Sequence, residues 1–347
     1  MRSLSAVETN RRVKPPVIAD VARVAGVSVP TVSRVLTGSA RVSAERKERV
    51  EAAIRQLGFR PNGAARALAM GGQPMIAVFA GNTTRFGYAS TLQGIEEAAR
   101  QEGYMVVISV VETDDRRTVE QAIDHALGQP LAGAVVLEFD PPGVASLAAI
   151  PSWLPTVAIA SGGSPESAVA HAFMDDRRAA AHATRYLLDL GHRTVHHVAI
   201  PSSGGDSARM LGWRDALEEA GAPVPKLISA DWSPLSGYDV GARLAHDPTV
   251  TAVLAGNDEL AMGLCKALTD NGRRVPEDVS VLGFDDHPLS QLWSPPLTTV
   301  RQDFVGLGRR AFGLLLAQVT TGEVPPSVRM NPELVVRSSA GPVARTA

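Results

Sequence analysis

The sequence predicts an N-terminal all-α helix-turn-helix domain followed by an α/β domain of two doubly wound lobes, each built on a parallel sheet. Three observations lead to this prediction. Residues 18–36 contain two short amphipathic segments with helical spacing, separated by a glycine-containing turn. From Pro74 onward, short apolar runs alternate with longer amphipathic segments, which is typical of parallel sheets covered by helices. Residues 1–66 carry 13 basic and 5 acidic side chains and the remainder carries 21 and 31, so a basic head precedes an acidic body.

The two segments before residue 37 have the features of short helices. The first ends at Gly26, which suits a left-handed C-cap. The second begins at Ser28, a good N-cap, and tolerates Pro30 in its first turn because no backbone donor is needed there. A small helical hairpin without a ligand is the alternative, but the basic charge favours contacts with DNA phosphates. The inward positions are Ile18, Val21, Ala22, Ala25, Val32, Val35 and Leu36, and the outward ones are Val29, Pro30, Thr31, Ser33 and Arg34.

The flanks of this helix pair complete the expected N-terminal organisation. Residues 1–16 are polar and basic without an apolar period, so we expect a disordered arm. Ser43 is placed to cap a third helix, and the helical domain is expected to span residues 17–60. The buried stripe of this third helix is Val50, Ala53, Ile54 and Leu57.

The alternating segments divide residues 74–341 into two similar lobes. We expect the first lobe to span about 74–189 and 301–329 and the second about 190–300 and 330–341, with residues 342–347 as a tail. In open parallel sheets, ligands bind beyond the carboxyl ends of strands, so the cleft between the lobes is the expected ligand site. The expected strand and helix segments are 75–79, 92–100, 105–109, 119–127, 134–137, 156–159, 194–200, 211–220, 226–229, 237–246, 252–254, 259–271 and 279–284.

Several polar or aromatic residues follow these strands. Asn257 and Asp285 come after apolar runs, and for each taken alone a helix or turn cap is the favoured interpretation. Arg209 lies beyond Gly204–Gly205, where a surface ion pair is the alternative. Trp232 follows a short strand, where simple packing is the alternative.

The run from Ile18 to Leu36 closely resembles the DNA-binding segment of the lactose-repressor/galactose-repressor (LacI/GalR) family, and the resemblance continues along nearly the whole chain. It implies a type I periplasmic-binding-protein-like effector domain, a near-palindromic operator and a homodimer. Residues 61–73 resemble the family's hinge, which implies that Leu68 enters the minor groove as an apolar wedge. An ordinary linker leucine is the alternative. The DNA-binding residues implied are Ser28, Val29, Pro30, Thr31, Ser33, Arg34, Arg41, Asn62, Ala65, Arg66 and Leu68.

The same resemblance implies an effector pocket. Arg209, Asn257 and Asp285 would hydrogen-bond ligand hydroxyls while Trp232 stacks on a sugar ring, and Phe86 and Tyr88 would contribute from the first lobe. The loop 84–88 departs from the family's usual asparagine-proline-aromatic-aromatic pattern, so the effector is not assigned by analogy. We expect a repressor of carbohydrate-utilisation genes that a sugar releases from its operator. A corepressor responsive to a purine or another metabolite is the alternative, and a stand-alone small-molecule binding protein is less favoured.

Other function classes lack their signatures. Residues 306–311 fit G-x-G-x-x-A but fall inside an expected helix, and no P-loop or G-x-S-x-G elbow is present, so we expect no enzyme and no cofactor. His192, His196 and His197 cluster, but the last two fall on an expected strand without a third ligand at suitable spacing, so they are expected to be structural and no metal is expected.

The single cysteine, Cys265, excludes an internal disulfide and is expected to pack on a helix. Without a signal segment or an apolar run long enough to cross a membrane, the chain is expected to be cytoplasmic. The tail 338–347 has no leucine heptad, which favours a dimer over a tetramer.

Overall fold

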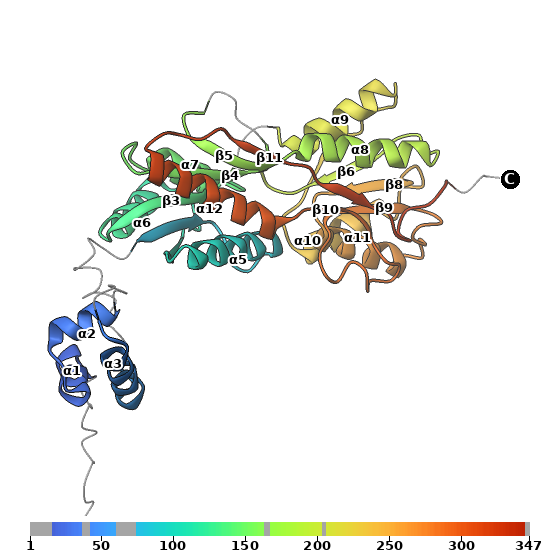
Figure 1. Cartoon of the computed structure of the whole chain (residues 1–347). Helices are drawn as coiled ribbons and strands as arrows, with labels where there is room; N and C mark the ends of the chain where they lie inside the picture. Colours follow the sequence, from blue (N-terminus) through green and yellow to red (C-terminus); the bar gives the residue numbers. More distant parts are fainter. Residues whose placement is uncertain (1–15, 37–41, 60–73, 163–166, 203–205, 344–347) are drawn as a thin grey trace, which may run out of the picture. The chain divides into compact units, whose positions relative to one another are not determined.

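A computed structural model describes residues 16–36, 42–59, 74–162, 167–202 and 206–343 (Figure 1). The chain divides into two compact units at the junction between Gln73 and Pro74, and each unit has its own hydrophobic core. In the described residues, no helix is long and apolar enough to span a bilayer.

The N-terminal unit contains three helices, α1 (Ile18–Ala25), α2 (Val29–Leu36) and α3 (Ala44–Leu57). Helix α1 ends at Gly26, whose φ of 65° is the left-handed conformation expected from the sequence. The carboxylate of Asp20 accepts a hydrogen bond from the backbone N–H of Val17 (3.0 Å), which satisfies a donor at the start of α1. The shared core consists of Val21, Ala22, Ala25, Val32, Val50, Ala53 and Phe59.

The first lobe is a parallel six-stranded sheet with helices on both faces. Helices α5 (Phe86–Gln101) and α12 (Phe304–Thr321) lie side by side and pack on one face, and α6 (Arg116–Leu127) and α7 (Pro141–Ala149) cover the other (Figure 1). The strands, in sheet order, are β11 (Val328–Met330), β5 (Ala170–Met174), β4 (Thr156–Ala160), β3 (Leu131–Leu137), β1 (Met75–Ala80) and β2 (Met105–Val110).

The second lobe repeats this architecture. Helices α8 (Asp176–Asp189) and α9 (Ala208–Glu219) cover one face, and α10 (Pro234–Leu244) and α11 (Asp258–Asp270) cover the other. All strand pairs are parallel except the one between β12 and β10. The sheet order is β12 (Glu333–Val335), β10 (Thr298–Arg301), β9 (Ser280–Asp285), β8 (Ala252–Ala255), β6 (His196–Ala199) and β7 (Ile228–Ser229).

Helix α8 corrects the expected lobe boundary. Its residues 176–189 were assigned to the first lobe, but Ala180, Ala183 and Leu187 are fully buried in the core of the second, against α9. The chain therefore enters the second lobe just before Asp176, because the apolar side of α8 finds its partner there. It returns to the first lobe between β10 and α12, and it crosses again between β11 and β12.

Candidate functional site

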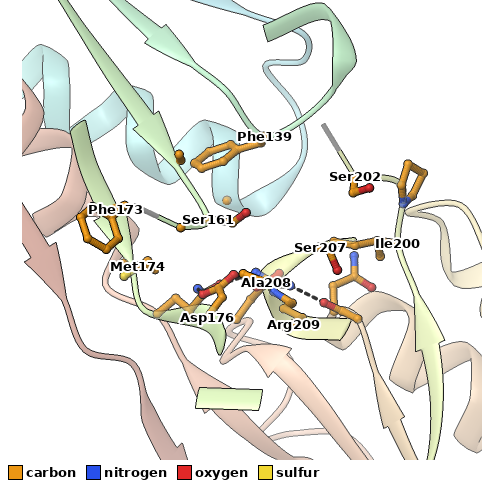
Figure 2. Close-up of a pocket in the computed structure, with 18 of the residues that line it drawn as sticks. Phe139, Ser161, Phe173, Met174, Asp176, Ile200, Ser202, Ser207, Ala208 and Arg209 are labelled. Carbon is orange, nitrogen blue, oxygen red and sulfur yellow. Dashed lines mark hydrogen bonds and ion pairs between the residues drawn. The ribbon is translucent and has the colours of Figure 1, made fainter. Parts of the chain in front are cut away.

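A cavity of about 500 Å³ lies between the two lobes of the second unit, at the carboxyl ends of their strands. Figure 2 shows Phe139, Ser161 and Phe173 on one side of this cavity and Ser207, Ala208 and Arg209 on the other. Its volume falls in the range typical of small-molecule sites. The sequence-predicted residues Phe86, Tyr88, Arg209, Trp232, Asn257 and Asp285 all line it.

The side chain of Arg209 is fixed from several directions. Its Nε donates to Asp176 Oδ2 (2.8 Å), one terminal nitrogen donates to Gln302 Oε1 (2.8 Å), and the other donates to the Gly256 carbonyl. Gln302 Nε2 in turn donates to Asp176 Oδ1 (2.6 Å). Although burial opposes its charge, the nearby carboxylates raise the pKa of Arg209. Arg209 is therefore a preorganised cation and not a mobile surface ion pair.

Asp285 has an unusual backbone and an incompletely satisfied carboxylate. Its φ of 109° is rare for a non-glycine residue, and such strain often occurs at functional sites. Its Oδ1 is 3.7 Å from an Arg209 nitrogen and has no hydrogen-bond partner among the described residues. Burial raises the pKa of Asp285 well above its usual value, and Arg209 only partly opposes this. The carboxyl group can therefore take a hydrogen bond from a ligand or, when protonated, give one.

Asn257 is both a helix cap and a cavity residue. Its Oδ1 accepts from the Leu260 backbone N–H at the start of α11 (2.8 Å), as the cap interpretation requires. Its Nδ2 donates to the Trp232 carbonyl (3.3 Å), which ties the segment before α10 to α11. The two interpretations of Asn257 are thus compatible.

The neighbouring Asp258 organises the loop that follows β9. It accepts hydrogen bonds from the His287 backbone N–H (2.7 Å), the Ser290 hydroxyl (2.7 Å) and the Thr299 hydroxyl (2.5 Å). Burial raises the pKa of Asp258 to about 7, although these three donors oppose the rise. Asp258 therefore holds in place the loop that carries His287 and begins directly after Asp285, the last residue of β9.

Two pairs of side chains connect the lobes across the cavity. The guanidinium of Arg85, in the first lobe, lies 4.7 Å from the ring centre of Trp232 in the second. The Phe86 ring, also in the first lobe, contacts the imidazole of His287 in the second, with ring centres 4.9 Å apart. Trp232 therefore presents one aromatic face to a cation of this chain, in addition to lining the cavity.

Tyr88 occupies a different position from that expected of a ligand-binding tyrosine. Its side chain is 2% exposed and its hydroxyl donates to Asp140 Oδ2 (2.5 Å). Burial raises the pKa of Tyr88, and the Asp140 charge adds to this effect. Tyr88 thus supports the first-lobe wall, with its only O–H group committed.

Sequence reasoning missed several residues that line the cavity. Glu138 directly follows β3, so the rule that selected Asn257 would also have found it. Asp176 was missed because β5 and α8 were not among the expected elements. The remaining missed residues that the geometry makes important are His171, Phe173, Gln302 and Phe304.

The outer face of α2 is the candidate nucleic-acid interface. Val29, Pro30, Ser33 and Arg34 are exposed, as is Ser28 just before the helix, whereas Thr31 is half-buried. The Ser28 and Thr31 hydroxyls are hydrogen-bonded to each other (2.9 Å). The other residues assigned to DNA binding, Arg41, Asn62, Ala65, Arg66 and Leu68, lie outside the described residues.

The glycine pattern, the histidines and the cysteine that could have indicated other kinds of site have structural roles in the fold. Residues 306–311 lie inside α12, where the Gly306 N–H donates to Asp303, and do not form a strand-to-helix turn. The ring of His192 is hydrogen-bonded to Thr251 and Ser280, and that of His197 to the Leu254 carbonyl. Cys265 is buried on α11. Across the described ranges, no cluster of three potential metal ligands occurs.

Comparisons with known proteins agree with both units. Residues 17–62 match the family model described as bacterial regulatory proteins, lacI family, and residues 184–340 match a periplasmic binding protein-like domain. The chain is 31% identical to the lactose operon repressor of Escherichia coli K12 over 93% of this chain and 90% of the relative. It is also 31% identical to the repressor PurR of Pasteurella multocida over 93% of this chain and 98% of the relative.

Solved structures show the same similarity. A lac repressor dimer bound to operator and the anti-inducer ONPF aligns with a TM-score of 0.84 at 30% identity, covering 94% of this chain and all of the other. A complex of the regulator CelR with cellobiose aligns with a TM-score of 0.69 at 29% identity, again covering 94% of this chain and all of the other. The predicted fold class, a helix-turn-helix domain plus a type I periplasmic-binding-like domain, is confirmed.

Proposed function

The chain belongs to the LacI family of bacterial regulatory proteins, and we propose that this DNA-binding transcriptional repressor is released from a near-palindromic operator by a sugar bound between its lobes. The observation that carries the proposal is the convergence of Arg209, Asn257, Asp285 and Trp232 on one cavity. These residues offer donors, acceptors and an aromatic plane, the combination that a polyol with an apolar C–H face requires. The similar structure of CelR holds cellobiose, which supports a saccharide.

A purine is the second candidate ligand. Its support is the 31% identity to PurR repressors, together with the aromatic residues Phe139, Phe173 and Trp232 in the cavity wall. In that case binding of the ligand would strengthen operator binding instead of weakening it. A stand-alone binding protein is disfavoured because the N-terminal unit matches a regulatory DNA-binding family over residues 17–62.

A homodimer is part of the proposal. The edge strand β2 of the first sheet exposes Met105, Ile108 and Val110, each between 45% and 49% exposed. In the second lobe, Leu235 and Leu292 are each 77% exposed. Exposed apolar edge strands favour association, and two-fold symmetry would match a near-palindromic operator. The similar lac repressor structure is a dimer bound to operator.

The proposed release couples the cavity to the DNA-binding unit. A sugar that contacts both lobes favours one closure of the second unit, whose first residues continue directly from the segment 61–73 that resembles the family hinge. By linkage, sugar and operator must weaken each other's binding by the same factor, which corresponds to about 1–3 kcal/mol in many allosteric proteins.

The test is a thermal-shift screen of the full chain with mono- and disaccharides and purines, followed by operator-binding titrations with each compound that raises the Tm. We expect a saccharide to raise the Tm and weaken operator binding, and Asp285→Ala to abolish both effects while sugar-free operator binding is unchanged. Asp270→Ala is the matched control, because Asp270 is an exposed carboxylate paired with Lys266 on the surface of α11. An unchanged sugar response in Asp285→Ala would contradict the proposed site, and a purine that strengthens operator binding would support the second candidate.

A further inference from the structure

We propose that Glu138, on the first-lobe wall, forms a recognition subsite that binds hydroxyl groups of an uncharged saccharide and excludes phosphorylated or otherwise anionic ligands. This inference rests on the proposed function, since it names the class of ligand that the same cavity accepts. It assigns a specificity role to a residue that directly follows β3.

Glu138 is held in place by a buried histidine. His171 Nε2 lies 3.4 Å from Glu138 Oε2, and its Nδ1 is hydrogen-bonded to the Val169 carbonyl (2.8 Å). The His171 side chain is 3% exposed and the Glu138 side chain 21%, so the carboxylate is the more accessible member of the pair. The hydrogen bond to Glu138 raises the pKa of His171 against the effect of burial.

The strand order explains how this pair meets. Glu138 follows β3 and His171 belongs to β5, and β4 runs between them in the sheet. Strand β4 places Ala158 beside His171, and the next residue on the same face of β4 is Ala160, so only methyl groups lie between the two longer side chains. The subsite is therefore built into the sheet and does not depend on a loop conformation.

The cations that line the described cavity are already engaged. Arg209 is bound to Asp176, Gln302 and the Gly256 carbonyl, and Arg177 Nε donates to Asp215 (2.7 Å). Arg85 lies over the Trp232 ring.

Seven acidic residues line the described cavity, against three arginines. Glu138 on the first lobe and Asp285 on the second both line the cavity, with Asp176 between Arg209 and Gln302. A phosphate would need charge-assisted donors, and here it would meet the like charge of the Glu138 carboxylate. A sugar hydroxyl instead donates to a carboxylate, a bond stronger than one between neutral groups. The charge pattern thus selects hydroxyl donors over anions.

The test compares sugars with their own phosphate esters. Isothermal titration of the full chain would use glucose, sucrose and trehalose, each against its 6-phosphate, together with the compounds found by the thermal-shift screen. We expect each sugar that binds to do so at least about tenfold more tightly than its ester. Glu138→Gln should weaken binding of the sugar about tenfold, because the amide keeps the shape of the side chain but loses its charge. The ratio between the affinities for the sugar and for its ester should therefore become smaller. Ligand-free operator binding and Tm should stay close to wild type.

Glu120→Gln is the matched control, because Glu120 is an exposed carboxylate on α6 paired with Arg116. An ester that binds as tightly as its parent sugar, unchanged sugar affinity in Glu138→Gln, or no saccharide binding at all would overturn the inference. If an ester bound as tightly as its parent sugar and also released the operator, the inference about Glu138 would fail, but the proposed function as a sugar-responsive repressor would stand. Release of the operator by no compound at all would instead contradict the proposed function itself.

Discussion

The ring of Phe86 in the first lobe lies edge-on to the imidazole of His287 in the second, with ring centres 4.9 Å apart and ring planes at 62°. The next residue back, Arg85, reaches Trp232 across the same cavity. Asp258 fixes the loop that carries His287, so the contact joins two well-supported elements. These side chains favour the lobe closure in which the cavity residues converge.

Removing the Phe86 ring should weaken ligand binding through the lobe equilibrium. Phe86→Ala deletes the contact with His287 across the lobes, so the closed arrangement loses apolar stabilisation that the ligand must then supply. We expect about tenfold weaker affinity by isothermal titration and a proportional rise in the sugar concentration that releases the operator. Phe86→Leu, which retains much of the apolar contact, should lose far less. Equal affinities for wild type and Phe86→Ala would show that this contact does not contribute to closure.

Arg34 should read one base pair in each half of the operator. It is exposed on α2, and a guanidinium can bind guanine O6 and N7 in the major groove. Arg34→Ala should cost about 1–3 kcal/mol and relax specificity at one symmetric position. Anisotropy titrations against single-base operator variants measure both effects. Arg23→Ala, which removes an exposed arginine paired with Asp20 on α1, should weaken all operators equally if it acts at all. A uniform loss for Arg34→Ala would assign it to phosphate contacts instead.

The sequence predicted the two-lobed fold because short apolar runs alternate with longer amphipathic segments from Pro74 onward. It failed at α8, whose first turn, Asp176–Ala179, carries three charged side chains and whose buried side consists largely of alanine. The two faces of such a helix differ little in hydrophobicity, so the sequence pattern does not reveal it. Only the packing of α8 against α9 shows which lobe it joins. The short strands β11 and β12, of three residues each, are likewise below the length at which periodicity is informative.

The residues of the candidate cavity were predictable where a local sequence pattern marks them, and not where contacts between distant positions place them. Residues that directly follow strands could be identified from the sequence, and Asn257 and Asp285 were. The engagement of Arg209 by Asp176 and Gln302 joins positions 33 and 93 residues away from it, and no local pattern reports such a contact. The commitment of the Tyr88 hydroxyl to Asp140 was hidden for the same reason.

His197 should make the stability of the second unit depend on pH. Burial lowers the pKa of His197 from 6.5 to about 4, so below pH 6.5 the unfolded chain binds a proton that the folded chain excludes. Its contribution is therefore fully present above pH 6.5 and declines as the pH falls toward 4. At pH 5 the loss should be about 2 kcal/mol. Urea unfolding at pH 7.5 and pH 5 should show a smaller stability difference between wild type and His197→Gln at pH 5. If the difference in unfolding free energy between wild type and His197→Gln were the same at both pH values, His197 would not be a neutral buried histidine. The carboxylates are present in both proteins, so their contributions cancel in this difference.

The contact between α5 and α12 should be intolerant of a single methyl group at Gly94. A Cβ atom there would lie 2.0 Å from the Val305 carbonyl oxygen, a rigid backbone atom, so the two helices would have to separate. Both helices pack into the first-lobe core, and overpacking of this kind typically costs about 1–3 kcal/mol. Gly313→Ala is the matched control, because Gly313 is also helical, is exposed, and has no atom within 4 Å of the added Cβ position. That control should be stabilised by up to about 1 kcal/mol, since alanine is the better helix former. Thermal unfolding of the two variants should therefore move the Tm in opposite directions, and a Gly94→Ala protein as stable as wild type would mean that the two helices can separate at little cost.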